Sequence, residues 1–394
     1  MAPKINSSHF SCFCIGTAGK AVVCPTNWRT FHGADGLWAW SYVLRYEFYT
    51  SMTVWPKELR PDLRAAVKAK HQNDLDLSEK YFRTAWGKAA ALSDPEAVLG
   101  SNHLLKTSGI AVALGDVLEQ NNKLADAYNV YCAAYEALHR SKLSEEKLEP
   151  SEMKRSIGIA LKLGEIAGRL RRDDDEEAWL VCSFEETLKA IRGDAALAGV
   201  STISSRTGDI RDDGQIALDD LDLPEWLNKA ELGAVTERLG EFYARKGNAE
   251  YAVPLYLQAI SLLIPPTAKE DGTSVTPENR CRGAMLMNNL ASLLVSSNAS
   301  VPQARAWAAK AFEVTLKARK DVPGEERLLE CEHVLVAALF NLGMLDEMEG
   351  KLDEAKDRYS SALGHSRGIG MKEGVKEAQL ALRRIGGSTT SKKS

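Results

Sequence analysis

The hydrophobic and polar positions of this chain follow a helical period over most of its length, and residues 231–266 show the pattern most clearly. The apolar residues in the first half of this segment recur three or four positions apart, as on one face of a helix: Leu232, Val235, Leu239 and Phe242. Gly247 and Asn248 follow, a residue suited to ending a helix and one suited to starting the next. A second apolar face runs through Ala252, Tyr256, Ala259 and Leu263. The segment is therefore predicted to form a helical hairpin.

Small residues mark the point where the two predicted helices cross. Gly240 and Ala252 lie twelve residues apart and leave room for close contact, while Tyr243 and Tyr256 fill the space beside the crossing. The same pattern predicts about six hairpins, whose first helices carry a small residue at Ala66, Gly115, Gly164, Gly240, Ala291 and Gly343. The counterparts in the second helices are Ser78, Ala127, Ala178, Ala252, Ala304 and Ala355, where Ala178 requires two extra residues in the charged turn before it. A single hairpin exposes its apolar flank, so the set is expected to stack into an array.

The order Leu239-Gly240-x-x-Tyr243, followed by Ala252 and Tyr256, resembles the tetratricopeptide (TPR) repeat. The segments Ala252–Tyr256 (AVPLY) and Asn288–Ala291 (NNLA) resemble, more narrowly, the repeats of kinesin light chains. The resemblance implies an all-α fold, a right-handed α-solenoid of about six TPR-like helix hairpins with a C-terminal capping helix.

Composition divides the chain into a repeat domain and less regular segments. These are an N-terminal extension over residues 1–50, the repeat domain over 56–385 with a loop insertion over 192–225, and a flexible tail over 386–394. The insertion is rich in Gly, Ser, Thr and Asp, which is typical of loops. Residues 1–34 contain no acidic residue, as in a mitochondrial presequence, with a disordered leader as the alternative. The apolar segment 37–44 is far shorter than the roughly 20 residues that span a bilayer, so it is expected to lie at a membrane surface or against protein.

Charge and motif content favour a protein that binds other proteins. The formal net charge of −4 disfavours nucleic acid as a partner, because phosphate binding needs a basic excess. None of the common catalytic, phosphate-loop or zinc spacings is present, and the acidic run 173–177 is predicted to be a solvated turn between helices rather than a Ca²⁺ site. The chain is therefore predicted not to be an enzyme and to need no cofactor or metal. The alternative is an enzyme whose site lies in a groove of the array or under the 192–225 loop.

Seven cysteines are scattered along the chain: Cys12, Cys14, Cys24, Cys132, Cys182, Cys281 and Cys331. The last four lie within helical patterns, where a free cysteine behaves as a small apolar residue. The number is odd and the spacing irregular, so no disulfide framework is implied. A reducing compartment, or one in which the thiols are buried, fits this distribution.

A stack of hairpins curves, so its first helices are expected to line a concave groove. The residue just before each crossing pair is predicted to face this groove, in a mostly polar row: Ala113, Lys162, Arg238, Asn289 and Asn341. Asn can donate to and accept from a peptide backbone, and Lys or Arg can meet a carboxylate. The groove is thus predicted to hold an extended polypeptide, with an added amide from Asn288 and apolar contacts from Met285 and Phe340. The alternative is an ordinary polar helix surface. Replacing Asn289 and Asn341 together by alanine is expected to weaken partner binding and to leave the melting temperature nearly unchanged.

A second resemblance is narrower. Residues 51–86 and 104–119 are similar to fungal TPR proteins of the mitochondrial i-AAA protease adaptor family. This resemblance implies a matrix-directed leader, one inner-membrane helix, and a TPR domain in the intermembrane space that delivers unfolded substrates to the protease. Where that family has its membrane helix, this chain has the segment 37–44 followed by Arg45. The alternatives are a soluble TPR scaffold for cargo or complex assembly, cytoplasmic if the leader does not function, and a respiratory-chain assembly factor.

Overall fold

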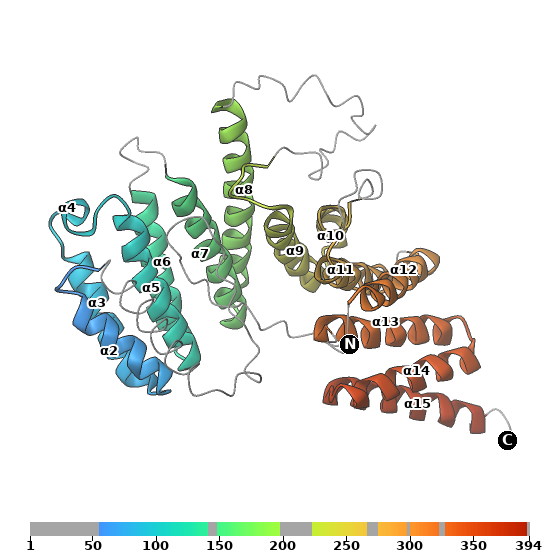
Figure 1. Ribbon diagram of the computed structural model, residues 1–394. Coiled ribbons are helices and arrows are strands. Elements are labelled where there is room, and N and C mark those ends of the chain that lie inside the picture. Colours follow the sequence, from blue (N-terminus) through green and yellow to red (C-terminus); the bar gives the residue numbers. More distant parts are fainter. Residues whose placement is uncertain are drawn as a thin grey trace, which may run out of the picture. The chain divides into compact units, whose positions relative to one another are not determined.

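The computed structural model describes residues 55–140, 148–197, 223–265, 275–297, 300–322 and 328–391, and the regular elements in these ranges are all helices (Figure 1). The all-α fold predicted from the sequence is confirmed. The N-terminal extension 1–50 and its apolar segment 37–44 lie outside the described residues. Among the helices that the structure does describe, none combines the length and the hydrophobicity that crossing a bilayer requires.

The chain divides into two compact units, Met1–Asn121 and Asn122–Ser394, and each is described by itself. The first unit contains α2 (Arg60–His71), α3 (Leu75–Ala90), α4 (Pro95–Leu99) and α5 (His103–Gln120). The second begins with α6 (Leu124–Arg140), α7 (Pro150–Arg169), α8 (Asp173–Leu197), α9 (Lys229–Lys246) and α10 (Ala249–Leu263). It continues with α11 (Pro277–Ser296), α12 (Val301–Lys320), α13 (Leu329–Met348), α14 (Leu352–Gly368) and α15 (Lys372–Ser391).

The hairpins predicted within one unit are present as packed helix pairs: α2–α3, α7–α8, α9–α10, α11–α12 and α13–α14. Within the second unit, successive pairs also pack on one another, through α8–α9, α10–α11 and α12–α13, and α15 packs on α14 as the predicted final helix. The remaining predicted pair, α5 and α6, is joined by Asn121 and Asn122 at the boundary between the units.

Local chemistry explains where the helices of the α9–α10 hairpin begin and end. Asn228 accepts a hydrogen bond from the Glu231 backbone N–H, and the Glu231 carboxylate accepts one from the Asn228 backbone, which is a complete capping box at the start of α9. Gly247 ends this helix at φ 80°, a left-handed conformation that glycine adopts without a Cβ penalty. Pro254 lies inside α10, within its second turn. The hairpin therefore forms where its sequence signals predict.

The helix crossing is built from the small residues that the repeat pattern predicted. Ala127, Ala252 and Ala355 are fully buried, and the glycines Gly115, Gly164, Gly240 and Gly343 are buried as well. A Cβ placed on Gly240 would lie 3.3 Å from side-chain atoms of both Leu255 and Tyr256. A Cβ on Gly343 would lie 3.0 Å from the Tyr359 ring. The helices of the α9–α10 and α13–α14 hairpins therefore approach as closely as a glycine allows.

Replacing Gly240 by leucine is expected to lower the free energy of unfolding by about 1–3 kcal/mol or more, because the added side chain overpacks the crossing. Leu255 and Tyr256 already occupy the space that the new side chain would enter. Chemical denaturation followed by circular dichroism measures the change. Gly158→Leu on α7 is the matched control, since a Cβ at Gly158 would meet nothing within 4 Å. Equal effects of the two substitutions would show that Gly240 is not at the crossing.

The register predicted for the third hairpin is wrong. Helix α8 begins at Asp173, so the acidic run 173–177 forms its first turns rather than an inter-helix turn, and acidic side chains there interact favourably with the positive end of the helix dipole. The turn is short, and Glu176, twelve residues after Gly164, takes the crossing position, while Ala178 is exposed. The carboxylate of Glu176 lies where a Cβ on Gly168 would be, within 2.7 Å. The prediction failed because a charged residue stands where the pattern expects a small one.

Two other predicted boundaries shift. Helix α8 continues to Leu197, into the segment predicted as a loop from residue 192, because the Ala-Ala-Leu sequence at 195–197 favours helix and outweighs one glycine. Helix α15 continues to Ser391, into the segment 386–394 predicted as a flexible tail. Its glycines lower helix propensity by about 1 kcal/mol each but keep their backbone N–H donors, and no proline interrupts them.

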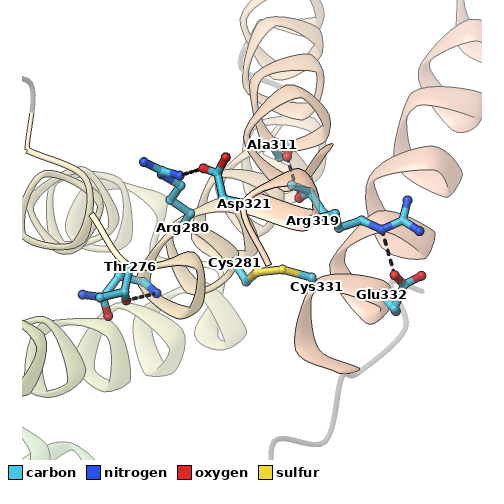
Figure 2. Close-up of a disulfide and its surroundings, with 10 residues drawn as sticks. Thr276, Arg280, Cys281, Ala311, Arg319, Asp321, Cys331 and Glu332 are labelled. Atoms are coloured by element: carbon cyan, nitrogen blue, oxygen red, sulfur yellow. Dashed lines mark hydrogen bonds and ion pairs between the residues drawn. A yellow bond between two sulfur atoms is a disulfide. The ribbon is translucent and has the colours of Figure 1, made fainter. Parts of the chain in front are cut away.

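Contrary to the prediction from cysteine spacing, the second unit contains a disulfide between Cys281 and Cys331 (Figure 2). It joins the N-terminal ends of α11 and α13, with the two Cα atoms 5.0 Å apart, inside the usual range for such a bond. Both residues are buried. Cys132 and Cys182 are free thiols, and the remaining cysteines lie outside the described residues. The pairing gave no local signal because the two cysteines are 50 residues apart and meet only when successive hairpins stack.

Candidate partner-binding face

The first helices of the second unit, α7, α9, α11 and α13, each carry one residue of the predicted polar row. Helix α11 contacts both α9 and α13, and a Lys154–Glu231 ion pair of 2.5 Å links α7 to α9. Lys162, Arg238 and Asn289 are half-buried, whereas Asn341 is buried. We call the half-buried residues Lys162, Arg238 and Asn289 the partner-binding face. They lie on successive, connected helices, as the sequence predicted.

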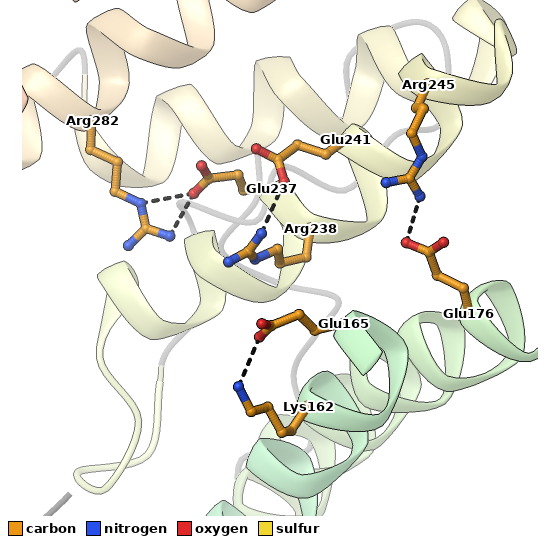
Figure 3. A network of polar contacts seen from close by, with 8 residues as sticks. All are labelled: Lys162, Glu165, Glu176, Glu237, Arg238, Glu241, Arg245 and Arg282. Atoms are coloured by element: carbon orange, nitrogen blue, oxygen red, sulfur yellow. Dashed lines mark hydrogen bonds and ion pairs between the residues drawn. The ribbon is translucent and has the colours of Figure 1, made fainter. Parts of the chain in front are cut away.

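The two cations of this face are held by acidic residues of their own helices (Figure 3). The Lys162 ammonium lies 3.2 Å from the Glu165 carboxylate, and the Arg238 guanidinium lies 3.3 Å from that of Glu241. Exposed or half-exposed pairs at this spacing contribute little to stability. They orient the cations and leave both side chains partly exposed, 30% for Lys162 and 27% for Arg238.

A second carboxylate stands beside Arg238 on α9. Glu237 is buried and accepts two hydrogen bonds from Arg282 of α11, at 2.8 and 2.5 Å (Figure 3). Burial, and then the neighbouring Glu237 charge, raise the pKa of Glu241 to about 6. The α9–α11 contact is therefore a compact network of two acids and two arginines that includes Arg238.

Of the three asparagines predicted to bind a ligand, Asn288 and Asn341 instead bond to each other in the core, whereas Asn289 is half-buried. The Asn341 side-chain NH₂ group donates to Asn288 Oδ1 at 2.9 Å and to Ser292 Oγ at 3.0 Å, which ties α13 to α11. Asn288 and Asn341 are only 3% and 8% exposed, so this pair fixes the packing of two repeats. Replacing Asn341 leaves buried polar groups without a partner, a cost of about 1–3 kcal/mol. Replacing Asn289 and Asn341 together by alanine is therefore expected to lower the melting temperature, contrary to the prediction from the sequence, because Asn341 is part of the core.

The two residues predicted to make apolar contacts with a ligand, Met285 and Phe340, differ in their surroundings. Met285 is half-buried on α11, one helical turn before Asn289. The Phe340 ring packs against the Tyr359 ring of α14, with centroids 5.2 Å apart, in a cluster that includes Ala355 and Ala381. Phe340 therefore contributes to the core of its own hairpin.

The sequence missed a set of ion pairs that join neighbouring helices of the second unit. Each places a buried or largely buried acid against an arginine of an adjacent helix: Glu176 with Arg245, Glu237 with Arg282, Glu332 with Arg319, and Asp346 with Arg305 and Arg358. The signal that could have revealed them is an acidic residue at a position where the helical pattern calls for an apolar one. Their partners could not be read from the pattern, because they lie on other helices.

One cluster of polar side chains, between α6, α7 and α8, contains residue types found in catalytic sites. Glu186 lies 2.7 Å from His139 Nε2 and accepts a hydrogen bond of 2.9 Å from Ser156, and the Tyr135 hydroxyl lies 3.0 Å from the Cys182 thiol. Ser156 and His139 thus contact the two oxygens of one carboxylate, Glu186. Burial raises the pKa of the Cys182 thiol, which disfavours the reactive thiolate. Within the described ranges, no group of three or more metal-ligating side chains converges.

No protein-family model matches the chain. A curated TPR repeat-containing protein of Schizosaccharomyces pombe is 27% identical over 158 residues, covering 38% of this chain and 40% of that protein. The chain thus matches less than half the length of this relative, and the match supports the TPR repeat as its building unit.

Several solved structures are similar in part. BtubC (BKLC) from P. vanneervenii is 15% identical with a TM-score of 0.49, over 75% of this chain and 92% of that one. The apo form of RapI is 10% identical with a TM-score of 0.49, over 85% and 72%. The TPR2AB domain of yeast Sti1, in complex with pHSP90, is 13% identical with a TM-score of 0.28, over 84% and 98%. The packed helix hairpins and the curated S. pombe relative support TPR-type helical repeats as the building unit of this chain.

Proposed function

We propose that this chain is a non-enzymatic adaptor or scaffold that holds a polypeptide segment against the partner-binding face. The observation that carries the proposal is the placement of Lys162, Arg238 and Asn289 on three successive first helices, each half-buried. Fixed cations and an amide, spaced from helix to helix, match the charged and backbone groups of an extended polypeptide. Repeat arrays present such extended surfaces in general.

The test compares two double variants of the full chain. Lys162→Ala with Asn289→Ala is expected to weaken binding of a labelled, permanently unfolded protein, measured by fluorescence anisotropy. The control is Lys189→Ala with Asn279→Ala, which removes the same residue types elsewhere, Lys189 being an exposed lysine paired with Glu185 at 3.0 Å. Thermal melts should be similar for both variants. Equal binding by both variants and the wild type would contradict the proposal.

In its finer form, we propose that the adaptor delivers unfolded substrates to a mitochondrial inner-membrane i-AAA protease. The resemblance of residues 51–86 and 104–119 to that adaptor family supports this role. The Cys281–Cys331 disulfide adds support for an oxidising compartment over the cytosol, because disulfides rarely persist in reducing conditions. Carbonate extraction and protease protection of isolated mitochondria test the location. Recovery of the native protein in the cytosol would favour the alternative of a soluble scaffold.

A further inference from the structure

Arg155 on α7 differs from the other half-buried arginines of the second unit. Each of those has a carboxylate within ion-pair distance in the structure: Arg238, Arg280, Arg282, Arg305, Arg319 and Arg358. Arg155 is half-buried as well, yet no described residue forms an ion pair, hydrogen bond or ring contact with it. Burial alone lowers the pKa of its guanidinium. A partly desolvated cation without a counter-charge is costly for the fold, so stability does not explain its presence.

The position of Arg155 on its helix directs it toward the partner-binding face. It lies nine residues before Gly164, which is about 180° around a helix, and Gly164 faces Leu180 of α8. Arg155 is therefore on the side of α7 that points away from α8. Lys162, seven residues further on, shares this side.

The surface between Arg155 and Lys162 is open. Gly158 is exposed, and a Cβ placed there would meet no atom within 4 Å. A bound chain can therefore approach the α7 backbone closely at this point. Lys162 is held by Glu165, whereas Arg155 has its donors unmatched among the described residues.

We propose that Arg155 is an anion-binding position of the partner-binding face, and that the bound polypeptide presents an acidic side chain to it. The guanidinium is planar and can donate two parallel N–H···O hydrogen bonds to one carboxylate. A carboxylate therefore supplies the missing counter-charge. This inference rests on the proposed function and names the chemistry of the bound segment, which is acidic where it crosses α7.

The experiment uses the full chain and two labelled synthetic peptides of equal length, one alternating Ser and Glu and the other alternating Ser and Gln. Fluorescence anisotropy at low salt measures both affinities. The wild type is expected to bind the Glu peptide about tenfold or more tightly than the Gln peptide, the range of a hydrogen-bonded charge pair. Arg155→Gln is expected to reduce this preference clearly, leaving the part that Lys162 and Arg238 supply. Arg155→Lys is expected to reduce it less, since lysine keeps the charge but cannot donate two parallel hydrogen bonds.

Two controls separate binding from structure. Arg367→Gln removes an exposed arginine of α14 and is expected to keep the full preference. The melting temperature of Arg155→Gln is expected to equal or exceed that of the wild type, because an unmatched, partly buried charge is lost. A clear drop in melting temperature would assign Arg155 a structural role and overturn the inference.

The outcomes distinguish this inference from the proposed function. If the wild type binds both peptides equally, or if Arg155→Gln keeps the preference, the inference is overturned and the adaptor function stands. If neither peptide binds, the inference is overturned and the unfolded-protein probe decides the adaptor function separately. Inorganic phosphate is added as a competitor and compared with chloride at the same ionic strength. If phosphate displaces the Glu peptide no better than chloride does, the position prefers a carboxylate. Displacement well below that concentration would overturn the choice of an acidic side chain as its ligand.

Discussion

Replacing Asp346 by alanine is expected to lower the free energy of unfolding of the second unit by about 3–5 kcal/mol, the range for removing one partner of a buried ion pair. The Asp346 side chain is fully buried on α13. One of its oxygens lies 2.8 Å from the Arg305 guanidinium of α12, and the other accepts a hydrogen bond of 2.5 Å from Arg358 of α14. Without the carboxylate, Arg358 loses its ion-pair partner and Arg305 keeps only Glu349.

Urea denaturation followed by circular dichroism measures this loss. Asp357→Ala on α14 is the matched control, because Asp357 is exposed and is expected to change stability by less than about 0.5 kcal/mol. Asp346→Asn keeps the shape of the side chain and one acceptor oxygen. Its loss in free energy of unfolding should therefore lie between those of Asp346→Ala and Asp357→Ala. A loss below about 1 kcal/mol for Asp346→Ala would mean that the triad does not hold the three helices together.

Removing the Cys281–Cys331 disulfide is expected to destabilise the second unit by roughly 4 kcal/mol in the loop-entropy model. The bond closes a loop of 50 residues that contains α12, and it ties α11 to α13 beside the ion pairs of Arg280 with Asp321 and Arg319 with Glu332 (Figure 2). The variant Cys281→Ser with Cys331→Ser should therefore melt well below the wild type. Reductant should lower the wild-type melting temperature toward that of the variant.

The double variant is its own control, because reductant should leave its melting temperature unchanged. Alkylation of the denatured, unreduced wild type should label the free thiols Cys132 and Cys182 but neither Cys281 nor Cys331. Labelling of Cys281 and Cys331 in protein purified without reductant would show that the bond does not form. A variant as stable as the oxidised wild type would show that hydrogen bonds such as Asn341 to Asn288 suffice to hold α11 against α13.

Local features of the fold were predictable because they depend on residues close in sequence. Gly240 and Ala252 identify a helix crossing through their spacing and size, and Gly247 marks the turn between the helices. The same logic failed at Glu176, where a charged side chain occupies a crossing position because Arg245 of α9 lies within 2.5 Å of it. The error at Ala178 thus came from a contact with the next hairpin.

The candidate site was predictable only in outline. The polar row was identified from its position before each crossing pair, and Lys162, Arg238 and Asn289 are half-buried on successive helices. The sequence could not show that Asn341 would donate a hydrogen bond to Asn288, since the two amides belong to different repeats. It also gave no reason to single out Arg155, which stands out only when the partners of the other arginines are known.

The sequence by itself determined the helices, their caps and the small residues where paired helices cross, because a helix period of 3.6 residues and cap chemistry act within a few positions of the chain. The tertiary structure alone decided which residues pair between hairpins. The Cys281–Cys331 bond, the Asp346–Arg305 ion pair and the amide pair of α11 and α13 each join residues of different hairpins, between 41 and 53 positions apart. Such contacts depend on how one hairpin is placed on the next, and that placement is the sum of many side-chain contacts that no local pattern records.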